Sequence, residues 1–354
     1  MSRPEVPSAP APERSTASAV ASGQPLLEVR HLVKHFPVGS MLERKQLHAV
    51  NDVSFTLDRG EVVALVGESG SGKSTTARLI VRLYEPTSGE IIFDGKDILK
   101  SEPRKASLAF RRRVQMIFQD PFGSLSPNHS IGFQLERPII IHKRARGRAA
   151  VREKVYQLLE TAGLNPPEEM ARKYPFELSG GQRQRVAIAR ALAVEPELIL
   201  ADEPVSMLDV SIRMGVLNLM HKLKEENGIG FLYITHDLAS ARYIADRTMV
   251  MYAGHIVEAG ESVTLMDNPQ HPYTQLLLSA VPNPRAGLRT REVQARGEIP
   301  SLINPPPGCP FAPRCPRVMS ECRKTMPGMS TIEQDHWLRC HLFSPNEQTA
   351  PAAS

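Results

Sequence analysis

The sequence of 354 residues lacks long apolar runs: stretches such as Val62–Val66 and residues 198–201 fall far short of the roughly 18 residues that a membrane span needs. Aromatic residues make up only 5% of the chain, which argues against a surface that stacks nucleic-acid bases. The net charge of +5 is too small to indicate a nucleic-acid partner. No basic segment followed by an apolar one opens the chain, as it would in a secretory signal peptide. We therefore expect a water-soluble, cytosolic protein that binds no nucleic acid.

Composition divides the chain into four parts. Residues 1–25 contain five Ala, five Pro and five Ser, and such a segment cannot bury enough apolar surface to offset its ordering entropy, so we expect a disordered tail. Over residues 26–265, strand patterns alternate with helical ones, which predicts an α/β layered core with a largely parallel sheet. Residues 266–345 combine stiff proline-rich segments with all four cysteines, which predicts a small second module. Residues 346–354 form a second tail.

The first functional motif lies between the buried-strand pattern Val62–Val66 and a helical pattern that runs from Lys73 to Leu83. It fits G-x-x-x-x-G-K-[ST], the phosphate-binding loop, and consists of Gly67, Glu68, Ser69, Gly70, Ser71, Gly72, Lys73 and Ser74. The glycines let backbone N–H groups turn toward phosphate oxygens, Lys73 supplies a positive charge, and the Ser74 hydroxyl can bind Mg²⁺. The alternative, a flexible Gly/Ser turn, is disfavoured by the strand-to-helix context.

Two carboxylates follow a second apolar strand pattern, at residues 198–201. Asp202 is suited to hold the Mg²⁺ shell, as a strand-end aspartate does in other nucleotidases with a phosphate loop. Glu203 is then suited to polarise an attacking water as a general base. An acidic turn is the alternative, but beside a phosphate loop the catalytic interpretation is favoured.

A third motif precedes another helical pattern and consists of Leu178, Ser179, Gly180, Gly181 and Gln182. With these three motifs in order, the sequence resembles the ATP-binding cassette (ABC) family over about residues 26–265. The resemblance implies an ATPase of the phosphate-loop type, with a mixed, largely parallel sheet and a helical subdomain that carries the third motif, the signature peptide. It also implies that one subunit's signature peptide closes over the ATP of another, so that a head-to-tail dimer forms two composite sites.

Other roles follow from the same resemblance, residue by residue. Phe36 is expected to stack on adenine, and the phosphate loop to extend to Thr75. Gln119 is expected to contact Mg²⁺ and water, as a third Mg²⁺ ligand beside Ser74 and Asp202, and His236 to sense the γ-phosphate. The dimer-contact loop is expected at Ser206, Leu208 and Asp209.

The C-terminal part looks like the extension of oligopeptide and dipeptide importer ATPases, in residues 268–274 (NPQHPYT) and 308–316 (GCPFAPRCP). The resemblance implies a second cassette ATPase, two membrane permeases and an extracytoplasmic solute-binding protein as partners, with this chain at the cytoplasmic face of the membrane. Met207 and the pair Asn128-His129 depart from the usual residues of that subfamily, and the pair lies near the expected permease contact. Relatives of this subfamily also drive oligosaccharide and metal-chelate importers, so these cargoes remain alternatives. A soluble cassette ATPase acting on nucleic acid or ribosomes is a more distant one, since this chain lacks a second cassette and a long coiled-coil insertion.

The cysteines, Cys309, Cys315, Cys322 and Cys340, have the spacing C-x5-C-x6-C-x17-C. A cytosolic chain argues against disulfides, and structural zinc sites more often use C-x₂₋₄-C pairs, which this sequence lacks. We interpret the four thiols as ligands of an iron–sulfur cluster of the [4Fe-4S] type, which the resemblance implies for some members of the subfamily. A zinc site, with His336 or His341 as substitute ligands, and metal-free buried thiols remain alternatives.

Overall fold

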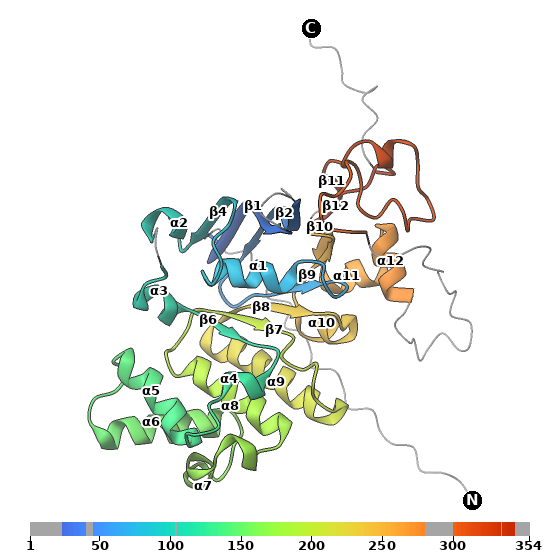
Figure 1. Ribbon diagram of the computed structural model, residues 1–354. Helices are drawn as coiled ribbons and strands as arrows, with labels where there is room; N and C mark the ends of the chain where they lie inside the picture. Colours follow the sequence, from blue (N-terminus) through green and yellow to red (C-terminus); the bar gives the residue numbers. More distant parts are fainter. Residues whose placement is uncertain (1–22, 40–44, 103–104, 280–299, 334, 344–354) are drawn as a thin grey trace, which may run out of the picture.

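The computed structural model describes residues 23–39, 45–102, 105–279, 300–333 and 335–343. The tails expected at residues 1–25 and 346–354 therefore lie almost wholly outside the described residues. Within the described ranges, no helix is both long enough and apolar enough to span a bilayer. Figure 1 shows a layer of strands with a helical lobe on one side and a smaller antiparallel sheet on the other.

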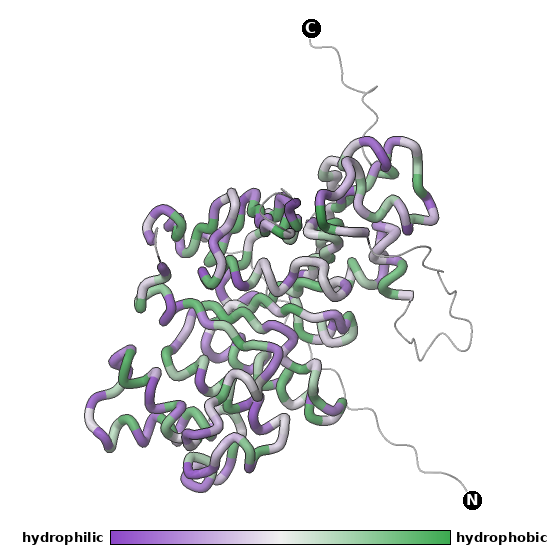
Figure 2. Tube along the Cα trace, in the orientation of Figure 1, coloured by the Kyte–Doolittle hydropathy of each residue, from purple (hydrophilic) through white to green (hydrophobic). Residues whose placement is uncertain are grey.

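The central layer is a mixed eight-stranded sheet with the order β11-β12-β10-β9-β3-β8-β7-β6. Its strands are β3 (Val62–Val66), β6 (Val114–Ile117), β7 (Leu198–Asp202), β8 (Gly230–Thr235), β9 (Arg247–Tyr252), β10 (His255–Glu261), β11 (Ser330–Glu333) and β12 (His336–Leu338). The five strands from β9 to β6 are parallel, whereas β10, β12 and β11 add antiparallel pairs. Strands β3, β7 and β8 are buried along their whole length, as continuous apolar runs of a sheet covered on both faces should be (Figure 2). The predicted α/β class with a largely parallel sheet is confirmed.

The smaller sheet is antiparallel, with the order β2-β1-β4-β5. Its strands are β1 (Leu27–Val38), β2 (Lys45–Leu57), β4 (Ser88–Phe93) and β5 (Lys96–Asp97). Because side chains alternate along a strand, β3 serves two cores: Val63 and Leu65 pack with the small sheet, while Val62, Ala64 and Val66 pack toward the helices. Strand β3 is therefore packed between two layers.

The helices follow the strands in the order that the α/β pattern predicts. They are α1 (Lys73–Ile80), α2 (Ile98–Ser101), α3 (Leu108–Arg113), α4 (Pro121–Ser124), α5 (Ile131–Ile141), α6 (Arg148–Thr161), α7 (Pro167–Arg172), α8 (Gly180–Leu192), α9 (Val210–Asn227), α10 (Leu238–Ile244), α11 (Ser262–Asp267) and α12 (Pro272–Ser279). Helices α5 to α8 pack on one another and form the helical lobe (Figure 1). Helix α1 was expected to reach Leu83 but ends at Ile80, because Arg82 adopts a left-handed backbone with φ 60°.

The C-terminal part adds strands to the central sheet. Strand β12 pairs with β10 through Glu258–Leu338 and Ala259–Trp337, and β11 pairs with β12. The buried Glu258 carboxylate accepts hydrogen bonds from the N–H groups of Gln270 (2.8 Å) and His271 (3.1 Å) and contacts His336 Nε2 (2.9 Å). Residues on both sides of the expected boundary at residue 265 therefore share one sheet, and the boundary itself stays a prediction.

Candidate nucleotide-binding and catalytic site

Four neighbouring parallel strands, β3, β8, β7 and β6, bring the predicted functional residues to one edge of the central sheet. Strand β3 leads into Gly67, β8 leads toward His236, β7 ends in Asp202 and Glu203, and β6 leads toward Gln119. In open α/β sheets, ligands bind at the carboxyl ends of parallel strands. Motifs from distant parts of the sequence thus meet where a ligand is expected.

The phosphate loop is shaped by close backbone approaches at its first and last glycines. A Cβ at Gly67 would lie 2.1 Å from the carbonyl oxygen of Met251, and one at Gly72 would lie 2.3 Å from that of Ala49. Both glycines also have positive φ, 154° and 108°, which side chains disfavour. Only glycine therefore fits these two positions, and the loop tip between them stays exposed.

Lys73 is buried at the base of this loop, at the first position of α1. Its ammonium donates hydrogen bonds to the carbonyl oxygens of Gly67 (2.7 Å) and Glu68 (2.8 Å). Burial lowers the pKa of Lys73, and the nearby carboxylates of Glu203 and Asp202 oppose that shift. The positive charge is thus held inside the loop that is predicted to surround phosphates.

Ser74 and Asp202 lie in direct contact, with the Ser74 hydroxyl donating to Asp202 Oδ1 at 2.8 Å. Asp202 is only 2% exposed, and this burial raises the pKa of its carboxyl group. Hydroxyl and carboxylate oxygens are hard donors, and Mg²⁺ takes one or two such protein ligands together with phosphate oxygens. The pair therefore fits the predicted Mg²⁺ site.

Glu203 lies between the two other predicted catalytic residues. Its Oε2 accepts a hydrogen bond from Gln119 Nε2 at 2.9 Å, and its Oε1 is 3.1 Å from His236 Nδ1. Gln119 is predicted to be a third Mg²⁺ ligand, but its amide nitrogen donates to Glu203, whereas Ser74 and Asp202 contact each other. The arrangement can orient the carboxylate of Glu203 toward a water molecule and hold it there.

The signature peptide begins helix α8 with a capping box. The Ser179 hydroxyl accepts from the Gln182 N–H (3.3 Å), and the Gln182 side chain accepts from the Ser179 N–H (3.0 Å). Leu178 is buried, and Gly180 lies beside Leu208 of the predicted dimer-contact loop. Helix α8 belongs to the helical lobe, apart from α1 and the phosphate loop of the same chain (Figure 1). A composite site with this peptide would therefore need a second subunit, as the resemblance implies.

Other members of the predicted set are Ser206, Asp209 and Phe36. The Ser206 hydroxyl donates to the carbonyl oxygen of Glu203 at 3.0 Å, and Asp209 immediately precedes helix α9. Phe36, half-buried on β1, meets the ring of Tyr84 edge-on at 5.5 Å, with the Lys34 ammonium 4.9 Å from its centroid. No sequence motif predicts Tyr84 as a neighbour of Phe36.

Two residues of the C-terminal part also reach the phosphate loop, and sequence reasoning missed both. Arg314 pairs with the Glu68 carboxylate at 2.8 Å, and the Tyr273 hydroxyl accepts a hydrogen bond from the Glu68 N–H at 3.0 Å. Both residues lie within the segments that resemble importer ATPases, residues 268–274 and 308–316, but their spacing does not predict this contact.

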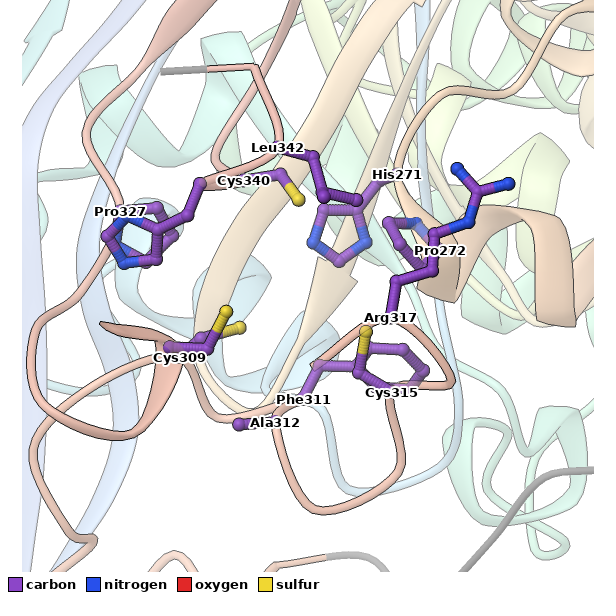
Figure 3. Close-up of a pocket in the computed structure, with 12 residues that line it drawn as sticks. His271, Pro272, Cys309, Phe311, Ala312, Cys315, Arg317, Pro327, Cys340 and Leu342 are labelled. Carbon is purple, nitrogen blue, oxygen red and sulfur yellow. The ribbon is translucent and has the colours of Figure 1, made fainter. Parts of the chain in front are cut away.

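The four cysteines come together around one small cavity, which His271 and His341 also line (Figure 3). Among the described residues, however, no group of three or more His, Cys, Asp or Glu side chains is placed to hold a metal ion. His336, a proposed substitute ligand, is instead buried against Glu258. The predictions of an iron–sulfur cluster and of a zinc site are therefore not supported.

The physical setting of the thiols is apolar. Burial raises the pKa of Cys309 to about 11 and also raises the pKa of Cys315 and of Cys340. Cys309 and Cys315 pack against the main hydrophobic core, as small apolar side chains do.

Comparisons with known proteins agree with this fold. The model of the ABC transporter family matches residues 50–206, and that of the oligopeptide/dipeptide transporter C-terminal region matches residues 257–322. The oligopeptide transport ATP-binding protein AppF of Bacillus subtilis is 45% identical, over 92% of this chain and 99% of the relative. The dipeptide transport ATP-binding protein DppF of Escherichia coli is also 45% identical, over 86% of this chain and 90% of the relative.

Solved structures give the same result. The dimeric ATP-binding cassette MJ0796 bound to ADP and Pi is 31% identical, with a TM-score of 0.58 over 67% of this chain and 98% of that chain. CbiO1 from Clostridium perfringens, part of the ABC transporter complex cbiONQ, is 27% identical, with a TM-score of 0.60 over 70% of this chain and 92% of that chain.

The fold and the phosphate-loop site define an ATPase of the cassette type. The chain belongs to the ABC transporter family and, within it, to the ATP-binding proteins that carry the oligopeptide/dipeptide transporter C-terminal region.

Proposed function

We propose that this chain powers the uptake of short peptides as the ATP-hydrolysing subunit of an ABC importer. It works with a second cassette subunit, two membrane permeases and an extracytoplasmic solute-binding protein, at the cytoplasmic face of the membrane. The peptide cargo is supported by the relatives, which are named for oligopeptide and dipeptide transport and match nearly the whole chain. The observation that carries the ATPase role is Glu203 held between Gln119 and His236, beside the Ser74–Asp202 pair.

In the proposed mechanism, Lys73 and backbone N–H groups of the loop at residues 67–75, other than that of Glu68, bind the ATP phosphates. Ser74, Asp202 and Gln119 would hold Mg²⁺, which supplies charge neutralisation for the phosphates when bound. Glu203 accepts a proton from the attacking water, and Gln119 and His236 keep its carboxylate aimed at that water. Closure of the partner subunit's signature peptide completes the site with the N–H groups of a helix N-terminus. Hydrolysis then reopens the dimer.

The permease contact is expected on the helical lobe, after Gln119. A groove there is lined by residues of α5 and of the segment before it, including His129, Phe133, Arg137 and Ile141. Phe133 is 41% exposed and Ile141 is 47% exposed, so the groove offers apolar surface to a partner. This groove contains His129, which belongs to the pair that departs from the usual subfamily residues near the expected permease contact.

Affinity purification of the tagged chain from detergent-solubilised native membranes tests this proposal. We expect mass spectrometry to find two permeases, a second cassette subunit and a solute-binding protein, and we expect the binding protein to bind short peptides. A binding protein that takes only oligosaccharides or metal chelates would refute the peptide cargo. Recovery of only ribosomal or DNA-associated partners would refute the transport role and leave the ATPase.

A further inference from the structure

Glu68, the second residue of the phosphate loop, is held by the C-terminal part of the chain. Arg314 makes a two-pronged contact with its carboxylate, from Nη1 to Oε2 at 2.8 Å and from Nη2 to Oε1 at 3.0 Å. The Glu68 N–H donates to the Tyr273 hydroxyl at 3.0 Å. Tyr273 and Arg314 lie 205 and 246 residues further along the chain, so the contact joins distant parts of the described sequence.

The arginine side of this contact is shielded from water, and the Glu68 side chain is 24% exposed. The Arg314 side chain is 9% exposed, and its guanidinium lies over the rings of Tyr252 (5.8 Å) and Phe311 (6.0 Å). Tyr252 in turn packs on Tyr273 and Phe311, at centroid distances of 4.4 Å and 5.3 Å. A bidentate arginine–carboxylate pair in such a setting is among the stronger charged contacts, unlike an exposed ion pair.

The turn that carries Arg314 is fixed by its own hydrogen bonds. The N–H of Ala312 donates to the carbonyl of Cys309 (3.0 Å), and the N–H of Arg314 donates to that of Phe311 (2.9 Å). Phe311, Ala312 and Cys309 also line the cysteine cavity (Figure 3). The guanidinium is thus presented to the phosphate loop from a rigid turn.

Glu68 connects this support to the phosphate-binding charge. Its carbonyl oxygen is one of the two carbonyls that accept from Lys73 Nζ, at 2.8 Å. A shift of Glu68 would therefore move a partner of the Lys73 ammonium. Arg314 also compensates the negative charge of a carboxylate that belongs to the proposed phosphate-binding loop.

We propose that Arg314 and Tyr273 are positioning residues for the phosphate loop. Through these two residues, the C-terminal part sets the affinity of the site for a nucleoside triphosphate. They act on Glu68 and, through its carbonyl, on Lys73, without touching the nucleotide. The inference rests on the proposed role of residues 67–75 in binding ATP.

The test compares two arginines that both tie the C-terminal part to the rest of the chain. Arg314→Gln removes the contact with the phosphate loop, whereas the matched control Arg339→Gln removes the pair with Asp52 on β2 (2.8 Å). The Kd for MgATP is measured by calorimetry on the full chain, together with the midpoint of thermal unfolding without nucleotide. We expect Arg314→Gln to weaken binding about tenfold, which is less than the full effect of losing two charged hydrogen bonds because Arg314 acts on the site only through Glu68. We expect Arg339→Gln to leave Kd within about twofold.

A double-mutant cycle shows whether Arg314 acts through Glu68. If it does, Glu68→Gln combined with Arg314→Gln weakens binding less than the product of the two single effects. If Arg314→Gln does not fold, Tyr273→Phe serves instead, because it removes only the hydroxyl that accepts from Glu68 and keeps the ring. We expect that variant to weaken MgATP binding about fivefold.

Equal losses of affinity in Arg314→Gln and Arg339→Gln, or an unchanged Kd in a folded Arg314→Gln or Tyr273→Phe protein, would overturn the inference and leave a purely structural clamp. Failure of the unsubstituted chain to bind MgATP would be a different result, since it would overturn the ATP site itself and the inference with it.

Discussion

Glu203 owes its position to backbone geometry as much as to its side-chain partners. It has a left-handed backbone, with φ 46°, which is uncommon outside glycine, and its N–H donates to the carbonyl oxygen of Ile234 on β8 at 2.8 Å. That bond fixes the first residue after β7. The carboxylate is therefore held between Gln119 and His236, and only 15% of the side chain is exposed.

The general-base role predicts a specific loss in Glu203→Gln. The amide keeps the volume of the side chain but cannot accept the proton of water, so MgATP binding is kept and turnover falls about 10²–10⁴-fold. ATP binding by calorimetry and phosphate release measure the two effects separately. Glu226→Gln, at an exposed glutamate that pairs with Lys222 on α9, is the matched control and should hydrolyse normally. Unchanged phosphate release in Glu203→Gln would refute this assignment of the base.

At this scale, local motifs could be predicted and long-range partners could not. Lys73 and Ser74 are fixed by an eight-residue motif, and Asp202 by its place at the end of an apolar strand. Arg314 and Tyr273 belong to no chemical motif, because their partner Glu68 lies more than 200 residues away. Such a contact depends on how distant elements pack, which periodicity does not encode.

The first residues of helix α8 combine a structural role with a proposed functional role. Its first residues form a capping box that stabilises the helix, and the same residues are proposed to face the phosphates bound by a partner subunit. The two uses can be separated, because aspartate caps a helix about as well as serine but adds a negative charge.

We therefore predict that Ser179→Asp keeps the stability of the chain within about 0.5 kcal/mol but prevents ATP-dependent dimerisation. Ser179→Ala is the control: it loses the cap, costs about 1 kcal/mol and adds no charge, so it should dimerise better than Ser179→Asp although it is less stable. Size-exclusion chromatography with MgATP and the co-purified second cassette subunit, in a Glu203→Gln background that slows hydrolysis, gives the readout. Normal dimerisation of Ser179→Asp would show that this helix end does not face phosphate.

The elements that could be predicted are those whose burial leaves a continuous pattern. Strands β3, β7 and β8 are buried on both faces and appear in the sequence as unbroken apolar runs. No clear sequence pattern predicts β11 and β12, which have four and three residues. Strand β12 pairs with β10, and β11 pairs with β12. Strands as short as these are defined by their partners and not by their own residues.

The whole molecule is organised around one continuous sheet that contains strands from both family regions. Strand β10 belongs to the central sheet and pairs with β12 of the C-terminal part, and the buried Glu258 on β10 contacts His336 on β12. Composition alone predicts a small second module after residue 265, because it shows prolines and cysteines but no pairing. A shared sheet and a shared buried carboxylate favour a single cooperative unit.

The only tryptophan of the chain tests this cooperativity, because Trp337 lies on β12 and packs against the core under the small sheet. We predict that urea unfolding followed by Trp337 emission coincides with unfolding followed by far-ultraviolet circular dichroism, as a two-state transition requires. His336→Leu removes a polar partner of buried Glu258, so the free energy of unfolding should fall by about 1.5–3 kcal/mol. Both urea midpoints should then fall together. If the C-terminal part were an independent module, the emission of Trp337 and the circular dichroism would change at different urea concentrations, and His336→Leu would shift the emission midpoint alone. Coincident curves in both proteins would instead mean that the phosphate loop and the C-terminal part that contacts it fold and unfold as one.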